Sequence, residues 1–361
     1  MRRLVCLGEE GRKGVFHKEL LSFSGNCLLE CVRRMQRIKT KAVFGPVPSR
    51  RLGVSLGVDL LPYKTCSMDC VYCECGATTC LTSERKEYFP TASVIAEIDE
   101  VLAAGRKIDY LTFSGVGEPT LHSGIGAIIE HVRQHWPDLK ICLLTNGTLL
   151  GSPELQKELR HLDLIVPSLD GSCEEEFRLI NRPAPGVTLA SVRDAILSFR
   201  KTNSCPMWLE IFIVPGVNDS PESAARFRDL AAQIAPDKVQ LNSLDRPGVE
   251  DWIEIPTTDE LEAVAALIRE KLPVEIVSKV RPVASAARHG RRVVPIAEYN
   301  ENILKTVRSR PCTGADIALA LNYDPDKVAS HLRRMEKAGL LVSEDGERGR
   351  FYRPAEKLPP A

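Results

Sequence analysis

A regular alternation of strand-like and helix-like segments, from residue 54 to residue 277, constrains the fold more than any other feature of this sequence. Apolar runs with strand character occur at residues 54–60, 110–113, 139–145, 162–169, 207–214, 238–244 and 274–277. Segments with helical periodicity lie between them, at residues 91–104, 123–135, from 153, 189–200, 221–234 and 258–271. Strands that alternate with helices in this way form βαβ units, in which the strands run parallel. The spacing therefore predicts a parallel α/β domain with about six βα units, fewer than the eight of a closed barrel.

Length and composition are those of a folded chain with room for a second domain. The chain has 361 residues, of which 43% are hydrophobic and 27% are charged. The formal net charge of +0 gives no bulk attraction to nucleic acid or to an anionic membrane. No apolar run approaches the roughly 20 residues of a membrane span. Twelve cysteines without a secretory signal indicate a reducing cytoplasm rather than disulfides.

Three cysteines, Cys66, Cys70 and Cys73, follow the first strand in a C-x3-C-x2-C spacing. Such closely spaced thiolates can converge on one soft metal centre, and an iron–sulfur cubane accepts cysteine thiolates at its iron corners. A cubane has four irons, and this motif supplies three cysteines. One iron would therefore remain open to a small molecule. Structural zinc is the alternative, with Cys75 or Cys80 as the fourth ligand.

Glycine and small polar residues gather where three of the strands end. Glycine lets the backbone approach a ligand closely, and barrel active sites collect at the carboxyl ends of the strands. A turn or helix-capping role is the alternative for the Asn, Ser and Asp residues among them. The candidate ligand-binding residues are Gly115, Gly117, Glu118, Pro119, Thr145, Asn146, Ser168 and Asp170.

The cysteine spacing, with an aromatic residue just before the last cysteine, resembles the signature of the radical S-adenosylmethionine (radical SAM) superfamily. The turn at residues 115–119 is similar to the looser G-x-G-E-P form of the Gly-Gly-Glu motif of that superfamily, with Val116 in the second position. Residues 44–51 and 62–66 resemble, more narrowly, an uncharacterised branch of predicted iron–sulfur oxidoreductases. The likeness extends over residues 43–277.

The resemblance implies a fold, two cofactors and a reaction. The fold is a partial (β/α)6 barrel, similar to a TIM barrel, over residues 43–278. The cofactors are a [4Fe–4S] cluster on the three cysteines and SAM, whose amino group the Glu118 turn would hold and whose ribose the next two strand ends would contact. Reductive cleavage of SAM would give methionine and a 5′-deoxyadenosyl radical, which removes a hydrogen atom from an unknown substrate. An electron donor such as flavodoxin or ferredoxin is then required.

Residues 44–53 are punctuated by Pro and Gly, which predicts a loop. Arg50 and Arg51 within it, and Arg246 after the strand at 238–244, are candidate contacts for an anionic substrate; solvated surface charge is the alternative. Polar residues alternate with apolar ones along that strand, so one polar face is expected to look into a substrate cavity.

The first 42 residues fit poorly with this plan. They carry Cys6, Cys27 and Cys31 and show no steady periodicity. Residues 1–42 are expected to be an N-terminal extension: either a segment that binds a partner or a metal, or sequence upstream of the true start, with Met35 as the candidate initiator.

The alternation of strands and helices ends at about residue 278, and a different domain type is expected beyond it. Residues 279–298 read as a linker, and residues 299–355 resemble a winged helix-turn-helix module with helices near 299–309, 314–321 and 325–338. The exposed face of the last helix is expected to offer Lys327, His331, Arg333, Arg334 and Lys337.

The partner of this module stays open between nucleic acid and a protein or peptide. DNA contact would suit the basic helix, but the hairpin that follows carries Glu344, Asp345 and Glu347, which repel phosphate. The alternative function for the whole chain is an iron–sulfur or zinc regulatory protein that senses redox state and binds DNA through this module.

Overall fold

The computed structural model describes residues 42–355, apart from residues 63, 246–247, 278–299, 301, 305, 308–309, 322 and 347. The predicted N-terminal extension, the linker and Arg246 therefore lie outside the described residues, except for Ala42. Within the described part of the chain, no helix combines the length and the apolar character that crossing a bilayer demands.

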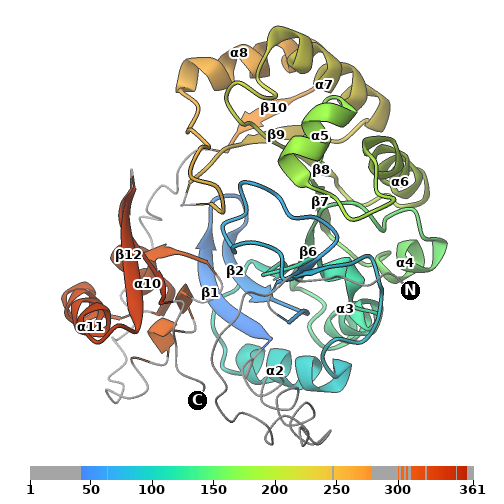
Figure 1. Cartoon of the computed structure of the whole chain (residues 1–361). Helices are drawn as coiled ribbons and strands as arrows, with labels where there is room; N and C mark the ends of the chain where they lie inside the picture. The colour runs from blue at the N-terminus through green and yellow to red at the C-terminus, as the bar shows by residue number, and fades with distance from the viewer. Residues whose placement is uncertain are drawn as a thin grey trace, which may run out of the picture. The chain divides into compact units, whose positions relative to one another are not determined.

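A parallel sheet forms the centre of residues 42–277 (Figure 1). Its parallel strands are β2 (Gly53–Val58), β5 (Tyr110–Phe113), β6 (Lys140–Thr145), β7 (Leu164–Pro167), β8 (Trp208–Phe212), β9 (Lys238–Asn242) and β10 (Val274–Ile276). The connecting helices are α2 (Thr91–Ala103), α3 (Ile125–His135), α4 (Pro153–Glu158), α5 (Glu174–Asn181), α6 (Leu189–Thr202), α7 (Pro221–Ile234) and α8 (Thr258–Arg269). A short 3-10 helix, η1 (Pro119–Leu121), precedes α3, and a small parallel pair is made by β3 (Thr65–Cys66) and β4 (Cys80–Leu81).

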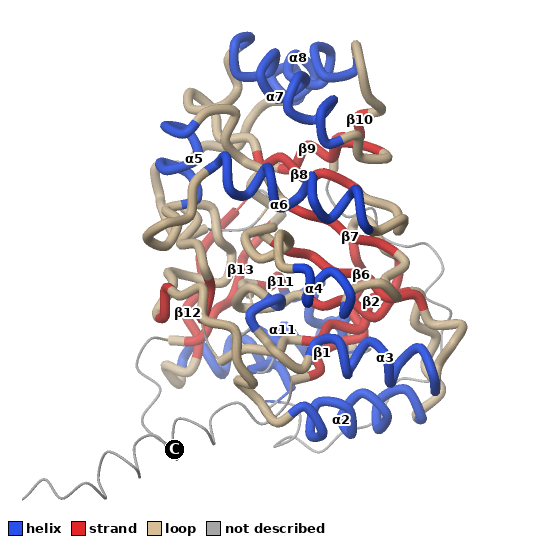
Figure 2. The backbone as a smooth tube through the Cα atoms, turned by 90° about the vertical axis from the view of Figure 1, so that its right-hand side faces the viewer, coloured by secondary structure: helices blue, strands red, loops and turns tan. Residues whose placement is uncertain are grey.

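The strand order follows the chain order. One sheet has the order β1-β2-β5-β6-β7, with β1 (Val43–Ser49) at its edge, and another has the order β10-β9-β8. Isolated parallel bridges between β7 and β8, at Ile165–Met207 and Ser168–Glu210, join the two. The helices lie on the outer side of the curved sheet (Figures 1 and 2). The structure thus has an α/β fold that is consistent with the predicted partial (β/α)6 barrel.

Strand alternation separates the two faces of this sheet. Ile141 and Ile165 belong to the large core between the strands and the outer helices, whereas their neighbours Cys142, Leu164 and Val166 form a separate apolar cluster on the opposite, inner face. The helices begin where the sequence supplies a cap: the side chains of Ser152, Thr188, Ser220 and Thr257 each accept a backbone N–H at the start of a helix.

Two features of this domain differ from the sequence-based prediction. The predicted loop at residues 44–53 is wrong: Val43–Ser49 forms β1, which pairs antiparallel with β2. An edge strand with a register shift between Phe44 and Val47 tolerates proline, because the missing N–H leaves no interior ladder bond unmade. Helix α5 was also missed, since its short sequence opens with consecutive glutamates rather than an apolar repeat.

The C-terminal part consists of β11 (Cys312–Thr313), α10 (Gly314–Leu321), α11 (Pro325–Lys337), β12 (Leu341–Gly346) and β13 (Gly349–Pro354), with the sheet order β11-β13-β12. Ile317, Val328 and Leu332 are buried in a core of its own. The prediction that His331 belongs to the exposed basic face of α11 is wrong. The His331 side chain is buried, and its Nδ1 is hydrogen-bonded to Asn300 Oδ1 at 2.9 Å. The basic residues of that face which are exposed are Lys327, Arg333, Arg334 and Lys337.

Candidate active site

The cysteine loop follows β2 and is held in place by α5. The backbone N–H of Asp69 donates to Asn181 O at 3.0 Å and that of Val71 to Ile180 O at 2.9 Å. The Val71 side chain is fully buried beside Ile180. The loop that carries the predicted cluster ligands is therefore fixed by an element that the sequence reading missed.

Each of the three predicted ligand sulfurs has a nitrogen donor within hydrogen-bonding distance. The donor groups come from three different segments: one precedes the cysteine loop, one follows β6 and one lies at the end of α5. The contacts are Lys64 Nζ to Cys73 Sγ at 2.9 Å, Asn181 Nδ2 to Cys70 Sγ at 3.4 Å and Asn146 Nδ2 to Cys66 Sγ at 3.6 Å. Donors in these positions stabilise negative charge on the sulfurs, which iron ligation requires.

The surroundings of Cys66, Cys70 and Cys73 shift the pKa values of these thiols in different directions. Burial raises the pKa of Cys66 to about 11, and burial also raises the pKa of Cys70. The hydrogen bond from Cys75, aided by the nearby Lys64 ammonium, lowers the pKa of Cys73 to about 6. Burial alone would lower the pKa of Lys64, but the charges on the neighbouring cysteines raise it. Cys73 is therefore the thiol best prepared to ligate as a thiolate.

The donor set fits a cubane better than a single tetrahedral ion. Among the residues that the structure describes, no three His, Cys, Asp or Glu side chains are placed to hold one metal ion. Zinc requires its ligands within about 2.3 Å of one centre, whereas the cysteines of a cubane bind separate irons. Cys80 is exposed, and Cys75 lies beside Cys73, with its sulfur 3.6 Å from Gly115 O.

The G-x-G-E-P turn packs directly against the cysteine loop. A Cβ on Gly117 would lie 1.9 Å from Thr65 O, so only glycine permits this approach. The backbone N–H of Glu118 donates to Thr65 O at 3.2 Å. Gly115 has φ +151° and leaves no room for a Cβ beside Asp59. The structure thus brings the two predicted motifs together.

The Glu118 carboxylate joins this turn to the end of β6. It is fully buried and accepts from Thr120 N at 3.1 Å, Thr120 Oγ1 at 2.6 Å, Thr145 Oγ1 at 2.7 Å and Asn146 N at 2.7 Å. Burial raises the pKa of Glu118, and these hydrogen bonds oppose that rise. Pro119 is buried at the start of η1. The assignment of Glu118 to the SAM ammonium group stays a prediction, because its oxygens already have partners within the protein.

Asn146, Asp170 and Ser168, the remaining candidate residues at the strand ends, differ in burial and in the groups that they contact. Asn146 reaches the cysteine loop, where its Nδ2 also donates to Ser67 Oγ at 2.9 Å. Asp170 is buried and accepts from Tyr72 Oη at 2.6 Å, Asn181 Nδ2 at 2.7 Å and the backbone N–H of residue 212 at 2.9 Å. Burial raises the pKa of Asp170 to about 6. Ser168 is half-buried and directly follows β7, where it forms a parallel bridge with Glu210 of β8.

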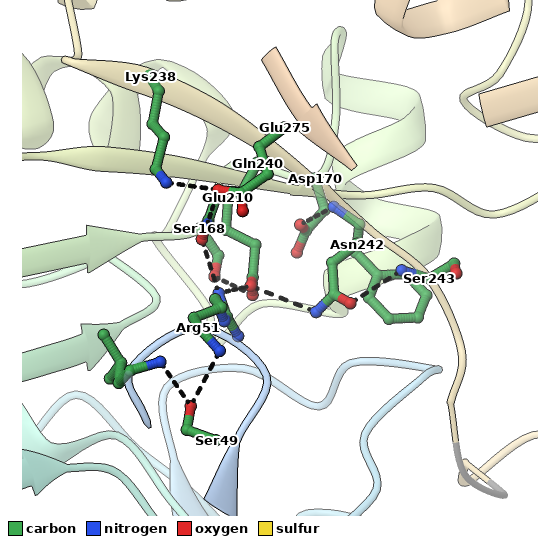
Figure 3. A network of polar contacts seen from close by, with 12 residues as sticks. Ser49, Arg51, Ser168, Asp170, Glu210, Lys238, Gln240, Asn242, Ser243 and Glu275 are labelled. Atoms are coloured by element: carbon green, nitrogen blue, oxygen red, sulfur yellow. Dashed lines mark hydrogen bonds and ion pairs between the residues drawn. The ribbon is translucent and has the colours of Figure 1, made fainter. Parts of the chain in front are cut away.

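A polar network on the inner face of the sheet was only partly expected (Figure 3). Arg51 donates to Glu210 on β8 and, at 3.2 Å, to Gln240 on β9; Asn242 Nδ2 donates to Glu210 at 3.3 Å. The alternation of polar and apolar residues along β9 predicted its polar face. No local signal linked Arg51 to Glu210, because the two lie 159 residues apart.

Comparison with known proteins agrees with this geometry. Residues 60–228 match the Radical SAM superfamily, a span that contains every predicted cysteine ligand and strand-end residue. The chain is 33% identical to a UPF0026 protein of Methanocaldococcus jannaschii over 311 residues, which are 86% of this chain and 94% of that one. The chain belongs to the UPF0026 family, and its residues 60–228 are a radical SAM domain.

Other matches share less of their length with this UPF0026 chain. It is 32% identical over 317 residues to a protein of Brachyspira hyodysenteriae named GTPase Obg, covering 88% of this chain but only 46% of that one. A crystal structure of a radical SAM methyltransferase from Sphaerobacter thermophilus aligns over 62% of this chain and 65% of that one, with a TM-score of 0.48 and 16% identity. The radical SAM domain assigns a [4Fe–4S] cluster and SAM as cofactors of this family member.

The ammonium group of Lys64 is expected to raise the reduction potential of the cluster. Lys64→Met keeps much of the side-chain length but removes the charge beside Cys73, so the midpoint potential should become more negative. A tenfold change in the equilibrium corresponds to about 59 mV for a one-electron couple, and we expect a shift of at least that size. An EPR-monitored redox titration measures it. Lys157→Met, on the exposed end of α4, is the control and should leave the potential unchanged. An unchanged potential in Lys64→Met would contradict the assigned contact.

Proposed function

We propose that the protein is a radical SAM enzyme that removes a hydrogen atom from an unidentified substrate. The observation that carries the proposal is the meeting of both motifs at one point: Gly117 against the Thr65 carbonyl, and Asn146 against Cys66. When bound, the reduced cluster supplies the electron that splits SAM into methionine and the 5′-deoxyadenosyl radical that attacks the substrate.

The residues of the chain have separate tasks in this proposal. Cys66, Cys70 and Cys73 would hold the cluster. The 115–119 turn would lie at the methionine end of SAM, and Glu118 fixes this turn to the end of β6 through its hydrogen bonds to Thr145 and Asn146. Asn146 and Asp170 orient the surroundings of the cysteine loop through their hydrogen bonds.

The aromatic residue of the cysteine motif closes one side of the site. Tyr72 stacks on Phe212 with ring centroids 3.8 Å apart, and its hydroxyl donates to Asp170. In this proposal the stacked rings limit the access of water to the cluster. Exclusion of water protects a reactive carbon radical from side reactions.

Anaerobic reconstitution tests the proposal. Purified full-length protein is loaded with iron and sulfide, reduced with dithionite and incubated with SAM, and 5′-deoxyadenosine is measured by chromatography. We expect its formation to depend on both dithionite and the cluster. A stable cluster that binds no SAM and yields no 5′-deoxyadenosine would favour the redox-sensing regulatory alternative instead.

For residues 299–355 we propose a winged helix-turn-helix arrangement that docks a protein or peptide. Helices α10 and α11 followed by the β12–β13 hairpin support the arrangement. Glu344 and Asp345 on the hairpin are exposed, and His331 is withdrawn from the surface of α11, which together weaken a DNA footprint. Fluorescence anisotropy with duplex DNA should show no binding beyond a weak, salt-sensitive interaction. Tight sequence-specific binding of DNA would instead support the alternative that the protein is a regulator that binds DNA through this module.

A further inference from the structure

A cavity of about 240 Å³ lies on the inner face of the sheet. Its wall includes Arg50 from the β1–β2 turn, Glu74 from the cysteine loop, and Ser114 and Gly115 from the start of the G-x-G-E-P turn. The cavity therefore connects the β1–β2 turn with the two motifs that the proposed reaction needs. Its size suits a small molecule or one end of a larger one.

The cavity has both polar and apolar walls. Ser55 and Thr112, from adjacent strands, share a hydrogen bond of 2.7 Å between their hydroxyls. The Phe44 ring packs on Gly57, and the apolar part of the wall is made by Phe44, Val47, Leu52 and Leu144. The interior of a closed barrel is normally filled by bulky branched residues. An unfilled cavity lowers stability relative to such packing, so its place beside the two motifs points to a bound ligand.

The β1–β2 turn that carries Arg50 is held rigidly (Figure 3). Ser49 Oγ accepts the backbone N–H of Arg51 at 3.3 Å and that of Leu52 at 3.2 Å. The Arg51 side chain is anchored across the inner face by Glu210 and Gln240. The position of the turn, and with it that of Arg50, is thus set before any ligand arrives.

Arg50 is the cation of this turn that has no counter-ion. Among the described residues it makes no hydrogen bond and no ion pair, whereas the charge of Arg51 is matched by Glu210. Burial lowers the pKa of Arg50, and the more distant carboxylates of Asp245 and Glu74 only oppose this effect. Asp245 itself is bonded to Arg348 at 2.6 Å. A half-buried guanidinium without a bonded anion is a site for a carboxylate or a phosphate group.

We propose that the substrate carries a carboxylate or phosphate group which Arg50 binds in this cavity, leaving its reacting carbon toward Ser114 and Gly115. The identification of the bound anion as the substrate rests on the proposed function. The binding of an anion by Arg50 does not. The shared chemistry is a planar or tetrahedral oxyanion that accepts two parallel N–H donors from one guanidinium.

Anion binding to the full-length reconstituted protein tests the proposal. Inorganic phosphate and succinate are titrated separately by isothermal calorimetry into wild type, Arg50→Gln and the control Arg160→Gln. Arg160 is exposed in the turn that follows α4 and is paired with Glu130 at 3.1 Å, so its loss should change nothing. We expect at least one of the two anions to bind wild type and to bind Arg50→Gln at least tenfold more weakly. The anion that shows this loss identifies the class of group.

Each further outcome decides between interpretations. If neither anion binds wild type, or if Arg50→Gln and Arg160→Gln bind equally well, the anion site is wrong. If Arg50→Gln instead weakens SAM while phosphate and succinate are unaffected, Arg50 serves the SAM carboxylate and the substrate assignment fails. Melting temperature and iron content, measured on every variant, show whether a loss comes from misfolding; Arg50→Lys, which keeps the charge, should then recover part of the binding. Arg50-dependent anion binding without any 5′-deoxyadenosine from wild type would leave the site standing and overturn the proposed function.

Discussion

Replacing any one of Cys66, Cys70 and Cys73 by alanine is expected to remove most of the cluster iron and to abolish cleavage of SAM. The reason is that three protein thiolates serve a cubane whose remaining iron is needed for SAM, so none is spare. The same loss is expected at each of the three positions, because each cysteine is assigned to its own iron. Iron analysis and 5′-deoxyadenosine assays after anaerobic reconstitution measure both effects.

Two other cysteines provide controls for this experiment. Cys142 is buried in the apolar cluster with Leu52 and Leu164, and Cys312 is buried in the C-terminal core. Cys142→Ala and Cys312→Ala should keep the cluster, although each is expected to lose some thermal stability through the small cavity left behind. A Cys73→Ala protein with a full cubane and normal turnover would refute the ligand assignment, and Cys75 would be the first residue to examine as a replacement ligand.

Replacing Glu118 by alanine is expected to weaken SAM binding while iron content stays near the wild-type level. A hydrogen bond to a charged group contributes about 1.5–3 kcal/mol, which corresponds to roughly one to two decades in the dissociation constant. The loss has two possible routes in this structure: direct contact with the SAM ammonium, or collapse of the turn and the β6 end that Glu118 joins. Calorimetric titration of SAM measures the size of the loss.

The Glu118→Gln variant separates these routes. It keeps the volume and one acceptor oxygen, so the hydrogen bonds to Thr120 and Thr145 survive in part while the negative charge is gone. Direct contact predicts nearly the full loss of SAM affinity in Glu118→Gln; a positioning role predicts a smaller loss there and a lower melting temperature in Glu118→Ala, because buried donors are left unsatisfied. Glu130→Ala, on the exposed side of α3, is the matched control. Unchanged SAM affinity in Glu118→Ala would remove the 115–119 turn from the SAM site.

The sequence was most informative where a local pattern has one physical meaning. The helix predicted at residues 221–234 agrees with α7 (Pro221–Ile234), because Ser220 caps it and its apolar residues recur at helical spacing. The strand predicted at 110–113 agrees with β5, an apolar run between turns. Prediction failed for β1, where proline and glycine suggested a loop although an edge strand accommodates both.

The candidate site also contains features that the sequence predicted and contacts that only the structure revealed. The sequence by itself determined the three cysteines and the G-x-G-E-P turn, because ligand spacing and glycine positions are local properties of the chain. Only the tertiary structure decided that Lys64, Asn146 and Asn181 each face a different cysteine sulfur, and that Arg51 is matched by Glu210 while Arg50 is not. Such contacts join residues up to 159 positions apart, and they arise from the closing of a curved sheet, for which no short sequence pattern exists.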